Sequence, residues 1–271
     1  MLNKIVFKGE RLVYRFLKNK KEFERLLKSD NLFLRQIGII FIESLQQNLT
    51  SQEKEVRNEV EALRKKLITE NLKISPNSNT DSVKDSVRYL AKVASKNEKW
   101  GILLMKMISN FDVKRGLEFG TCIGISAAYQ AGIMKKKDSG EFISIEGIEA
   151  RKNLSGENLK MLGLDNVELH CGSFDEILPM VLQLHGEFDF LFIDGDHRYK
   201  ATVDNFHKVL PHLKENSIVV VDDIKWSDGM KRAWLEIKKN DRIAFTFDLF
   251  LVGVCIIGDA EKSEEFKISL W

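Results

Sequence analysis

Residues 116–126, GLEFGTCIGIS, decide the fold of this 271-residue chain. A short apolar run ends in two glycines four positions apart, and a segment rich in alanine and isoleucine follows. This order predicts a β-strand, a tight loop and a helix, because Gly120 permits close backbone approach and Gly124 lets the helix start tightly against the strand. In an open α/β sheet such a loop lies at the carboxyl edge of the strands, where ligands bind.

Four more units of the same kind follow. The apolar runs GLEF, FISI, VELH, FDFLFI and SIVVV each precede a helical pattern, which predicts five parallel strands with helices on both faces. Residues 242–249 and 250–257 are also apolar, but no helix fits between them, so they predict a terminal antiparallel hairpin. The expected fold class is α/β, a Rossmann-like doubly wound sheet with a terminal antiparallel hairpin, plus an N-terminal helical region.

The chain divides near residue 80. Residues 1–73 contain no proline and repeat apolar residues at intervals of three and four, as helices do. Residues 74–82, ISPNSNTDS, concentrate the residues of turns and linkers. We therefore expect a helical region at 1–80 and an α/β domain at 81–271.

One predicted helix of the N-terminal region carries an apolar seam. The seam consists of Val56, Val60, Leu63 and Leu67, spaced 4-3-4 on a segment rich in charge. It fits a homodimer formed through the N-terminal helices, and it fits packing against the same chain equally well.

Composition excludes several classes of protein. A formal charge of +2 and a pI near 8.3 are too low for a phosphate-binding domain, so no nucleic-acid partner is expected. The three cysteines are far apart and form no CxxC pair, and the N-terminus has no signal-peptide core, which together favour the cytoplasm. Nine Lys/Arg against three Glu in residues 1–28 allow a membrane-surface helix, although the solvated face of an ordinary helix is the simpler interpretation.

The glycine loop favours a cationic ligand over a dinucleotide. Its spacing is G-x-x-x-G, which lacks the middle glycine that cradles a pyrophosphate. Glu118, at the end of the strand, would repel a diphosphate and suits an ammonium group. An NAD-dependent oxidoreductase is therefore the weaker interpretation.

An acidic residue followed by G-x-x-x-G, as in Glu118 to Gly124, resembles the first motif of the class I S-adenosylmethionine-dependent methyltransferases. The terminal hairpin agrees with their fold. By this resemblance Glu118, Gly120, Thr121, Gly124 and Ser126 belong to the cofactor loop. Gly120, Thr121 and Ser126 are expected to line the methionine part of the cofactor.

Two further segments complete the expected cofactor site. Glu146 ends the second strand, where an acidic residue binds ribose hydroxyls; Glu149 competes, but fits the first turn of the next helix better. Gly172, Ser173 and Phe174 follow the third strand and match the segment of the family that meets adenine. Ser173 is also a good N-cap, and both roles are compatible.

Three aspartates are expected at the reaction end of the site. Asp194 follows the fourth strand, and Asp222 and Asp223 follow the fifth, so the three should converge. Their mutual repulsion suggests a divalent cation, most naturally Mg²⁺. The arrangement resembles the catechol and caffeoyl-CoA type O-methyltransferases, which hold a metal with Asp and an Asp-Asn pair; here Asp223 replaces the Asn. Capping of the following loop is the alternative role for Asp222 and Asp223, and Asp194 is expected to contact the cofactor as well.

The expected reaction is methyl transfer from S-adenosylmethionine to a hydroxyl oxygen of a small-molecule acceptor. In the related family a lysine three residues after the first metal-binding aspartate removes the acceptor's proton; here that position is His197. Imidazole is a competent base near neutral pH, so His197 and Asp194 are the expected catalytic residues. Residues 1–80 would pack, oligomerise or cover the acceptor. A nitrogen acceptor and a catalytically silent binding protein remain as alternatives.

Overall fold

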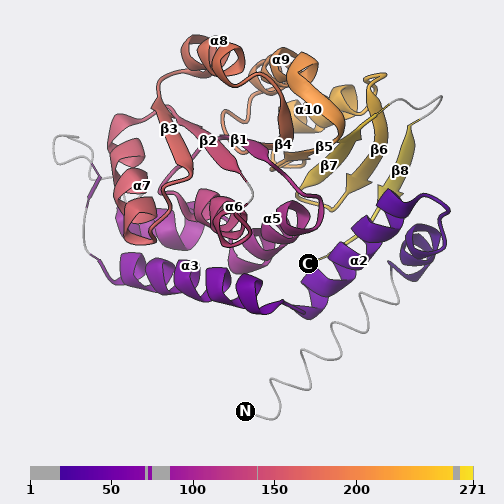
Figure 1. The fold of residues 1–271 in the computed structure, drawn as a ribbon. Helices are drawn as coiled ribbons and strands as arrows, with labels where there is room; N and C mark the ends of the chain where they lie inside the picture. The colour runs from indigo at the N-terminus through magenta and orange to yellow at the C-terminus, as the bar shows by residue number, and fades with distance from the viewer. Residues whose placement is uncertain (1–18, 71–72, 75–85, 139, 259–262, 271) are drawn as a thin grey trace.

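The computed structural model describes residues 19–70, 73–74, 86–138, 140–258 and 263–270. It contains an eight-stranded sheet in the order β3-β2-β1-β4-β5-β7-β6-β8 (Figure 1). The strands are β1 (Arg115–Phe119), β2 (Glu141–Glu146), β3 (Val167–Cys171), β4 (Phe188–Ile193), β5 (Leu213–Val221), β6 (Ile243–Asp248), β7 (Gly253–Ile257) and β8 (Glu264–Lys267).

The five predicted parallel strands and the terminal hairpin are confirmed. Strands β1 to β5 pair in parallel, and β7 pairs antiparallel with both β5 and β6. The fold class is therefore the predicted one. Strand β8, which pairs in parallel with β6, was not predicted, because its sequence EEFK contains a single apolar residue.

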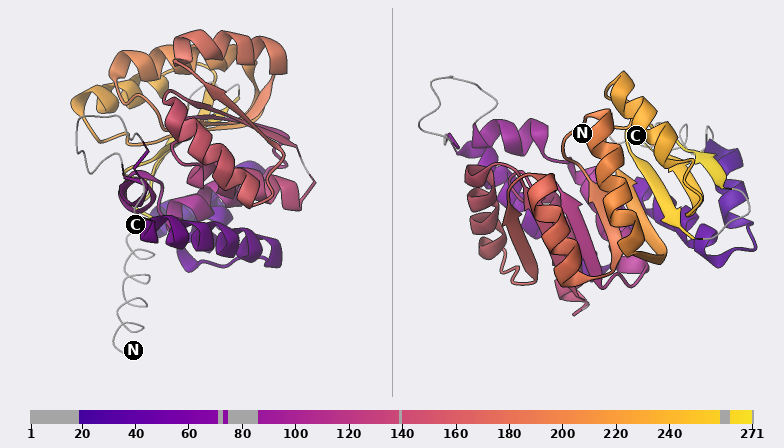
Figure 2. Two further views of the ribbon diagram at one scale, coloured as in Figure 1. Left: turned by 90° about the vertical axis from the view of Figure 1, so that its left-hand side faces the viewer. Right: turned by 90° about the horizontal axis from the view of Figure 1, so that it is seen from above.

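Helices cover both faces of the sheet (Figures 1 and 2). One face carries α8 (Phe174–His185), α9 (Tyr199–Val209) and α10 (Asp228–Ile237). The other face carries α2 (Leu32–Gln46), α3 (Ser51–Thr69), α5 (Glu98–Asn110), α6 (Ile125–Lys136) and α7 (Glu149–Met161). Short turns of helix, α4 (Val87–Tyr89) and the π-helical η2 (Leu90–Ala94), lead into α5.

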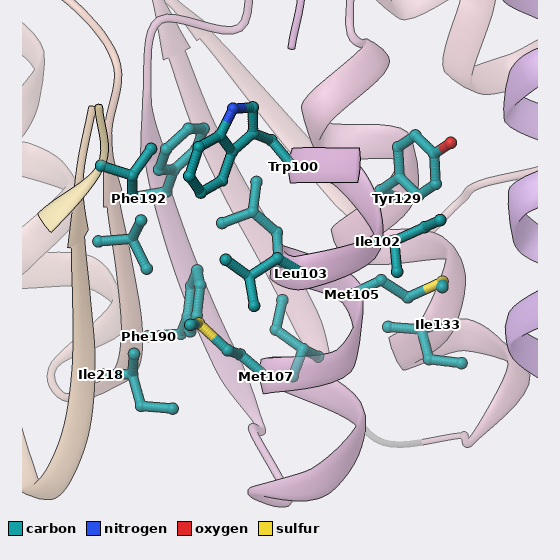
Figure 3. Close-up of a cluster of buried hydrophobic side chains, with 14 of the residues drawn as sticks. Trp100, Ile102, Leu103, Met105, Met107, Tyr129, Ile133, Phe190, Phe192 and Ile218 are labelled. Atoms are coloured by element: carbon teal, nitrogen blue, oxygen red, sulfur yellow. The ribbon is translucent and has the colours of Figure 1, made fainter. Parts of the chain in front are cut away.

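Alternation along the strands divides the core into two clusters. Phe190 and Phe192 of β4 face the N-terminal helices, whereas Leu191 and Ile193 face α8, α9 and α10. Figure 3 shows α5 as the centre of the larger cluster, with Trp100, Leu103 and Met107 against β4 and β5, and Ile102 and Met105 turned toward α6. Helix α5 thus joins the N-terminal helices to the sheet.

The apolar seam of α3 packs against its own chain. Val56, Val60, Leu63 and Leu67 are each at most 4% exposed, and α3 lies on α6. Gly132 of α6 makes this contact close, since a Cβ there would lie 2.9 Å from Val56. A homodimer through the N-terminal helices stays a prediction, and it would need residues other than this seam.

The N-terminal 18 residues, which carry much of the basic charge, lie outside the described residues. The prediction of a membrane-surface helix therefore stays a prediction. Among the helices that the structure describes, none is long and apolar enough to cross a membrane.

A buried cation ties three helices together. Lys106 of α5 is 2% exposed, and its Nζ lies 2.8 Å from Glu43 of α2 and 3.1 Å from Glu53 of α3. Glu53 is 1% exposed and also accepts the Thr50 N–H in the capping box that begins α3. Removal of the ammonium would leave the Glu53 charge desolvated.

We expect Lys106→Met to lower the free energy of unfolding by about 3–5 kcal/mol, because it leaves a buried carboxylate without its partner. The measurement is urea unfolding followed by circular dichroism. Lys114→Met is the matched control, since the Lys114–Asp112 pair is exposed; its effect should stay within about 0.5 kcal/mol. Equal losses in both variants would contradict the argument.

Candidate active site

A cavity of about 440 Å³ opens at the carboxyl ends of β1 to β4, where the glycine loop predicted a ligand site. Its size is that of small-molecule sites. The lining residues come from five segments of the chain: Gly120, Cys122, Glu146, Gly147, Arg151, Gly172, Ser173, Phe174, Asp194, Gly195, Asp196 and His197.

The loop after β1 passes very close to the loop after β4. Gly120 has φ +92°, and a Cβ there would lie 2.3 Å from the carbonyl oxygen of Asp194. Only glycine fits both constraints. Gly124, at φ +84°, is the N-cap of α6. The loop therefore leaves its backbone, rather than side chains, facing the cavity.

Glu146 holds this loop and also reaches the cavity. Its Oε2 accepts the Cys122 N–H at 2.7 Å and its Oε1 accepts the Ile148 N–H at 3.0 Å. A carboxylate has further lone pairs beyond these two, so it retains capacity to accept hydrogen bonds from a ligand. Glu149, the competing candidate, is exposed in the first turn of α7 and is not among the lining residues.

Glu118 lies beneath the loop instead of on the cavity wall. It is fully buried, and it accepts hydrogen bonds from Ser144 Oγ at 2.6 Å and Gln130 Nε2 at 3.0 Å. Burial raises the pKa of Glu118 to about 7, although the hydrogen bonds oppose this rise. Its neighbours Leu117 and Phe119 face the other side of the sheet, so alternation turns Glu118 under α6.

Three more of the predicted cofactor residues are absent from the lining of this cavity. Thr121 and Ser126 are buried, and Thr121 Oγ1 bonds Ser144 Oγ at 2.6 Å. Gly124 packs against Ser155 of α7. Glu118, Thr121, Gly124 and Ser126 thus pack behind the loop with their side chains or backbone, and their direct contact with the cofactor stays a prediction.

The segment after β3 lies where it was expected. Gly172, Ser173 and Phe174 all line the cavity. Ser173 also caps α8, with its side chain accepting the Glu176 N–H, so both predicted roles fit. Phe174 packs on Phe119 with 4.8 Å between ring centroids. The result is an apolar ring at the cavity edge.

The reaction end of the site brings the predicted residues together. His197 Nε2 lies 3.8 Å from both Asp194 Oδ1 and Asp223 Oδ2. The imidazole is 31% exposed, and both His197 and Asp194 line the cavity. Asp222 is 2% exposed in the adjoining loop after β5. Convergence follows from the pairing of β4 with β5.

Sequence reasoning missed Lys96, which occupies the centre of this cluster. Its ammonium hydrogen-bonds Asp222 Oδ2 and lies 3.5 Å from Asp194 Oδ1. Burial raises the pKa of Asp194 to about 6, against the opposing charges of Lys96 and His197. Lys96 precedes α5 by two residues, in a stretch with other lysines, and no sequence signal distinguishes it from them.

The donor set does not fit the divalent cation that was predicted at Asp194, Asp222 and Asp223. An ammonium already bridges Asp194 and Asp222, where the ion would have to bind. Within the described part of the chain, the group whose ligand atoms all lie within 4.8 Å is Glu168, His170 and His185. That group joins β3 to the end of α8 through His–Glu pairs and shares no residue with the cavity lining.

The pKa of Glu118 makes the stability of the fold depend on pH. Because the folded carboxyl binds its proton more tightly than an unfolded one, the free energy of unfolding should fall as pH rises from about 5 to about 8. The expected loss is about 3 kcal/mol at most.

Glu118→Gln should remove most of this dependence, because an amide never ionises and the buried Oε1 of Gln130, which has no hydrogen-bond partner, is available to accept from it after a side-chain flip. The measurement is urea unfolding at several pH values, with Glu149→Gln as the exposed control. Parallel curves for wild type and Glu118→Gln would contradict the assignment.

Comparison with known proteins agrees with this geometry. Residues 117–224 match the model of a methyltransferase domain family. A stretch of 59 residues is 36% identical to an uncharacterized protein of Acanthamoeba polyphaga mimivirus, which covers 20% of this chain and 27% of that protein. The chain thus spans about a quarter of the length of this curated relative.

Solved structures of similar fold are also methyltransferases. The O-methyltransferase TomG of Streptomyces achromogenes, solved with S-adenosylmethionine, is 19% identical with a TM-score of 0.53, covering 60% of this chain and 82% of that one. A methyltransferase of Podospora anserina with S-adenosylhomocysteine bound is 18% identical with a TM-score of 0.56, covering 79% of this chain and 89% of that one. A putative caffeoyl-CoA O-methyltransferase of Staphylococcus aureus is 21% identical with a TM-score of 0.54, covering 66% of this chain and 93% of that one. Residues 117–224 are therefore a methyltransferase domain, and the chain has the fold of the class I S-adenosylmethionine-dependent methyltransferases, as the resemblance in its sequence implied.

Proposed function

We propose that this protein transfers a methyl group from S-adenosylmethionine to a hydroxyl oxygen of a small molecule. One observation carries the proposal: Glu146, the carboxylate that ends β2, lines the same cavity as the Asp194–His197 pair. A cofactor site and a base therefore share one space. Similar folds described as O-methyltransferases support transfer to oxygen.

The residues of the cavity fit this cofactor. Glu146 would accept the ribose hydroxyls, and Gly172, Ser173 and Phe174 would enclose the adenine. Gly120 leaves room for the methionine part, because no side chain projects from it. When bound, the cofactor supplies a methyl group on a positively charged sulfur. Cys122, Gly147, Arg151, Gly195 and Asp196 also line the cavity and were not predicted.

His197 would remove the proton of the acceptor hydroxyl. The ring lies at the cavity wall, and Asp194 and Asp223 lie near enough to hold its orientation and stabilise the imidazolium. The rest of the barrier would be lowered by positioning, an effect that can reach about 7–11 kcal/mol. Asp194 thus acts beside the base, as the sequence suggested.

The remaining expectations belong to the same proposal. Residues 81–271 are the cofactor-binding domain, and the region of residues 1–80 serves in packing, in oligomerisation or as a cover of the acceptor. The location is the cytoplasm, the acceptor is a small molecule, and no nucleic acid is bound. The low net charge and the few, separate cysteines support the statements on nucleic acid and on location.

Calorimetric titration with S-adenosylhomocysteine tests the cofactor site. We expect wild-type protein to bind it and Glu146→Ala to bind at least about tenfold more weakly, since hydrogen bonds to a charged group are lost. Glu149→Ala is the matched control, because Glu149 lies three residues further along the chain and is exposed; it should bind like wild type. Absence of binding by wild-type protein would remove the proposed function.

The base is tested by turnover. Wild-type protein and His197→Gln are incubated with S-adenosylmethionine and a panel of phenols and alcohols, and methyl ethers are detected by mass spectrometry. We expect kcat to fall by about 10²–10⁴ in His197→Gln while S-adenosylhomocysteine affinity is retained. His207→Gln, exposed on α9, is the control. Full turnover in His197→Gln would exclude this histidine as the base.

A further inference from the structure

Lys96 lies between Asp194 and Asp222, two of the three residues predicted to bind a divalent cation. We propose that its ammonium replaces the divalent cation, so that this methyltransferase orients and activates its acceptor without a metal. The inference rests on the proposed function and names the positive charge that would act on the acceptor in that reaction. Its basis is the contact of Lys96 with Asp222 and its 3.5 Å approach to Asp194.

The charges of the cluster favour Asp194 and Asp222 with an ammonium between them over the same two carboxylates without a cation. Asp222 is 2% exposed, and the ionised form of a carboxylate at this burial is stabilised by a cation close by. The side chain of Lys96 is 14% exposed and supplies that charge from within the protein. Magnesium would need near-octahedral oxygen ligation at about 2.0–2.1 Å, and an ammonium between the same oxygens excludes it.

Lys96 is held by the N-terminal helices. The Arg64 guanidinium of α3 donates to the Lys96 carbonyl at 2.5 Å and to the Ala91 carbonyl at 3.1 Å. Arg64 is 8% exposed and is itself paired with Glu61. The backbone of Lys96 is therefore fixed from outside the methyltransferase domain, as required of a group that positions a substrate.

The ammonium has a donor to offer the acceptor. It carries three N–H groups, of which Asp222 and Asp194 account for two. The third can bind the acceptor oxygen and stabilise negative charge as His197 takes the proton. A bond then forms between that oxygen and the methyl carbon, the sulfur–methyl bond breaks, and its electron pair stays on sulfur as a neutral thioether. Lys96 keeps its proton throughout.

Binding of Mn²⁺, followed by electron paramagnetic resonance, tests the replacement directly. Wild-type protein should show no stoichiometric Mn²⁺ at this site, and EDTA should leave its turnover unchanged. In Lys96→Met the carboxylates lose their ammonium, so Mn²⁺ affinity should rise on the order of 100-fold. Lys96→Met/Asp222→Asn should lose the gained affinity, which locates the ion. Lys92→Met, an exposed lysine of η2, should bind Mn²⁺ like wild type.

Two results would overturn the proposal. One is stoichiometric Mn²⁺ binding by wild-type protein that Asp222→Asn abolishes; the other is wild-type turnover lost in EDTA and restored by Mg²⁺. Both measurements use the wild-type chain or an intact Lys96, so they stand even where Lys96→Met fails to fold. S-adenosylhomocysteine binding, measured on the same samples, distinguishes failure of this inference from failure of the proposed function.

Discussion

The desolvation of carboxylates at the carboxyl edge of the sheet is the constraint on which this site depends. Glu118 and Glu146 lie at the ends of the neighbouring strands β1 and β2, Asp222 directly follows β5, and each is at most 5% exposed. Each is compensated differently. Neutral donors surround Glu118, two backbone N–H groups hold Glu146, and an ammonium pairs with Asp222.

The different partners of the three carboxylates give them different positions at the site. Glu118 has only neutral partners, and its raised pKa suits a supporting group in the floor. Glu146 uses its oxygens to shape the glycine loop while still facing the cavity. Lys96, paired with Asp222, and His197 both approach Asp194. Glu146 and His197 thus line one cavity, in which the proposed cofactor binding and the proposed chemistry would meet.

The N-terminal helices belong to the same core as the sheet. Val56 of α3 contacts α6, and Lys106 of α5 links α2 and α3. Arg64 extends this connection to the backbone of Lys96. Any change in how these helices pack is therefore expected to alter the position of the ammonium at the site, which lies far from them in sequence.

The sequence by itself determined the five parallel strand–helix units, the terminal hairpin and the placement of Glu146, Asp194 and His197 at or just after strand ends. It could do so because periodicity and loop glycines are local signals, and strand ends in such a sheet share one edge. The tertiary structure alone decided which of these side chains face the cavity, as the burial of Glu118 and Thr121 shows. It alone placed β8 and Lys96, because the edge pairing of a polar strand and the reach of one lysine among many depend on contacts between segments distant in sequence.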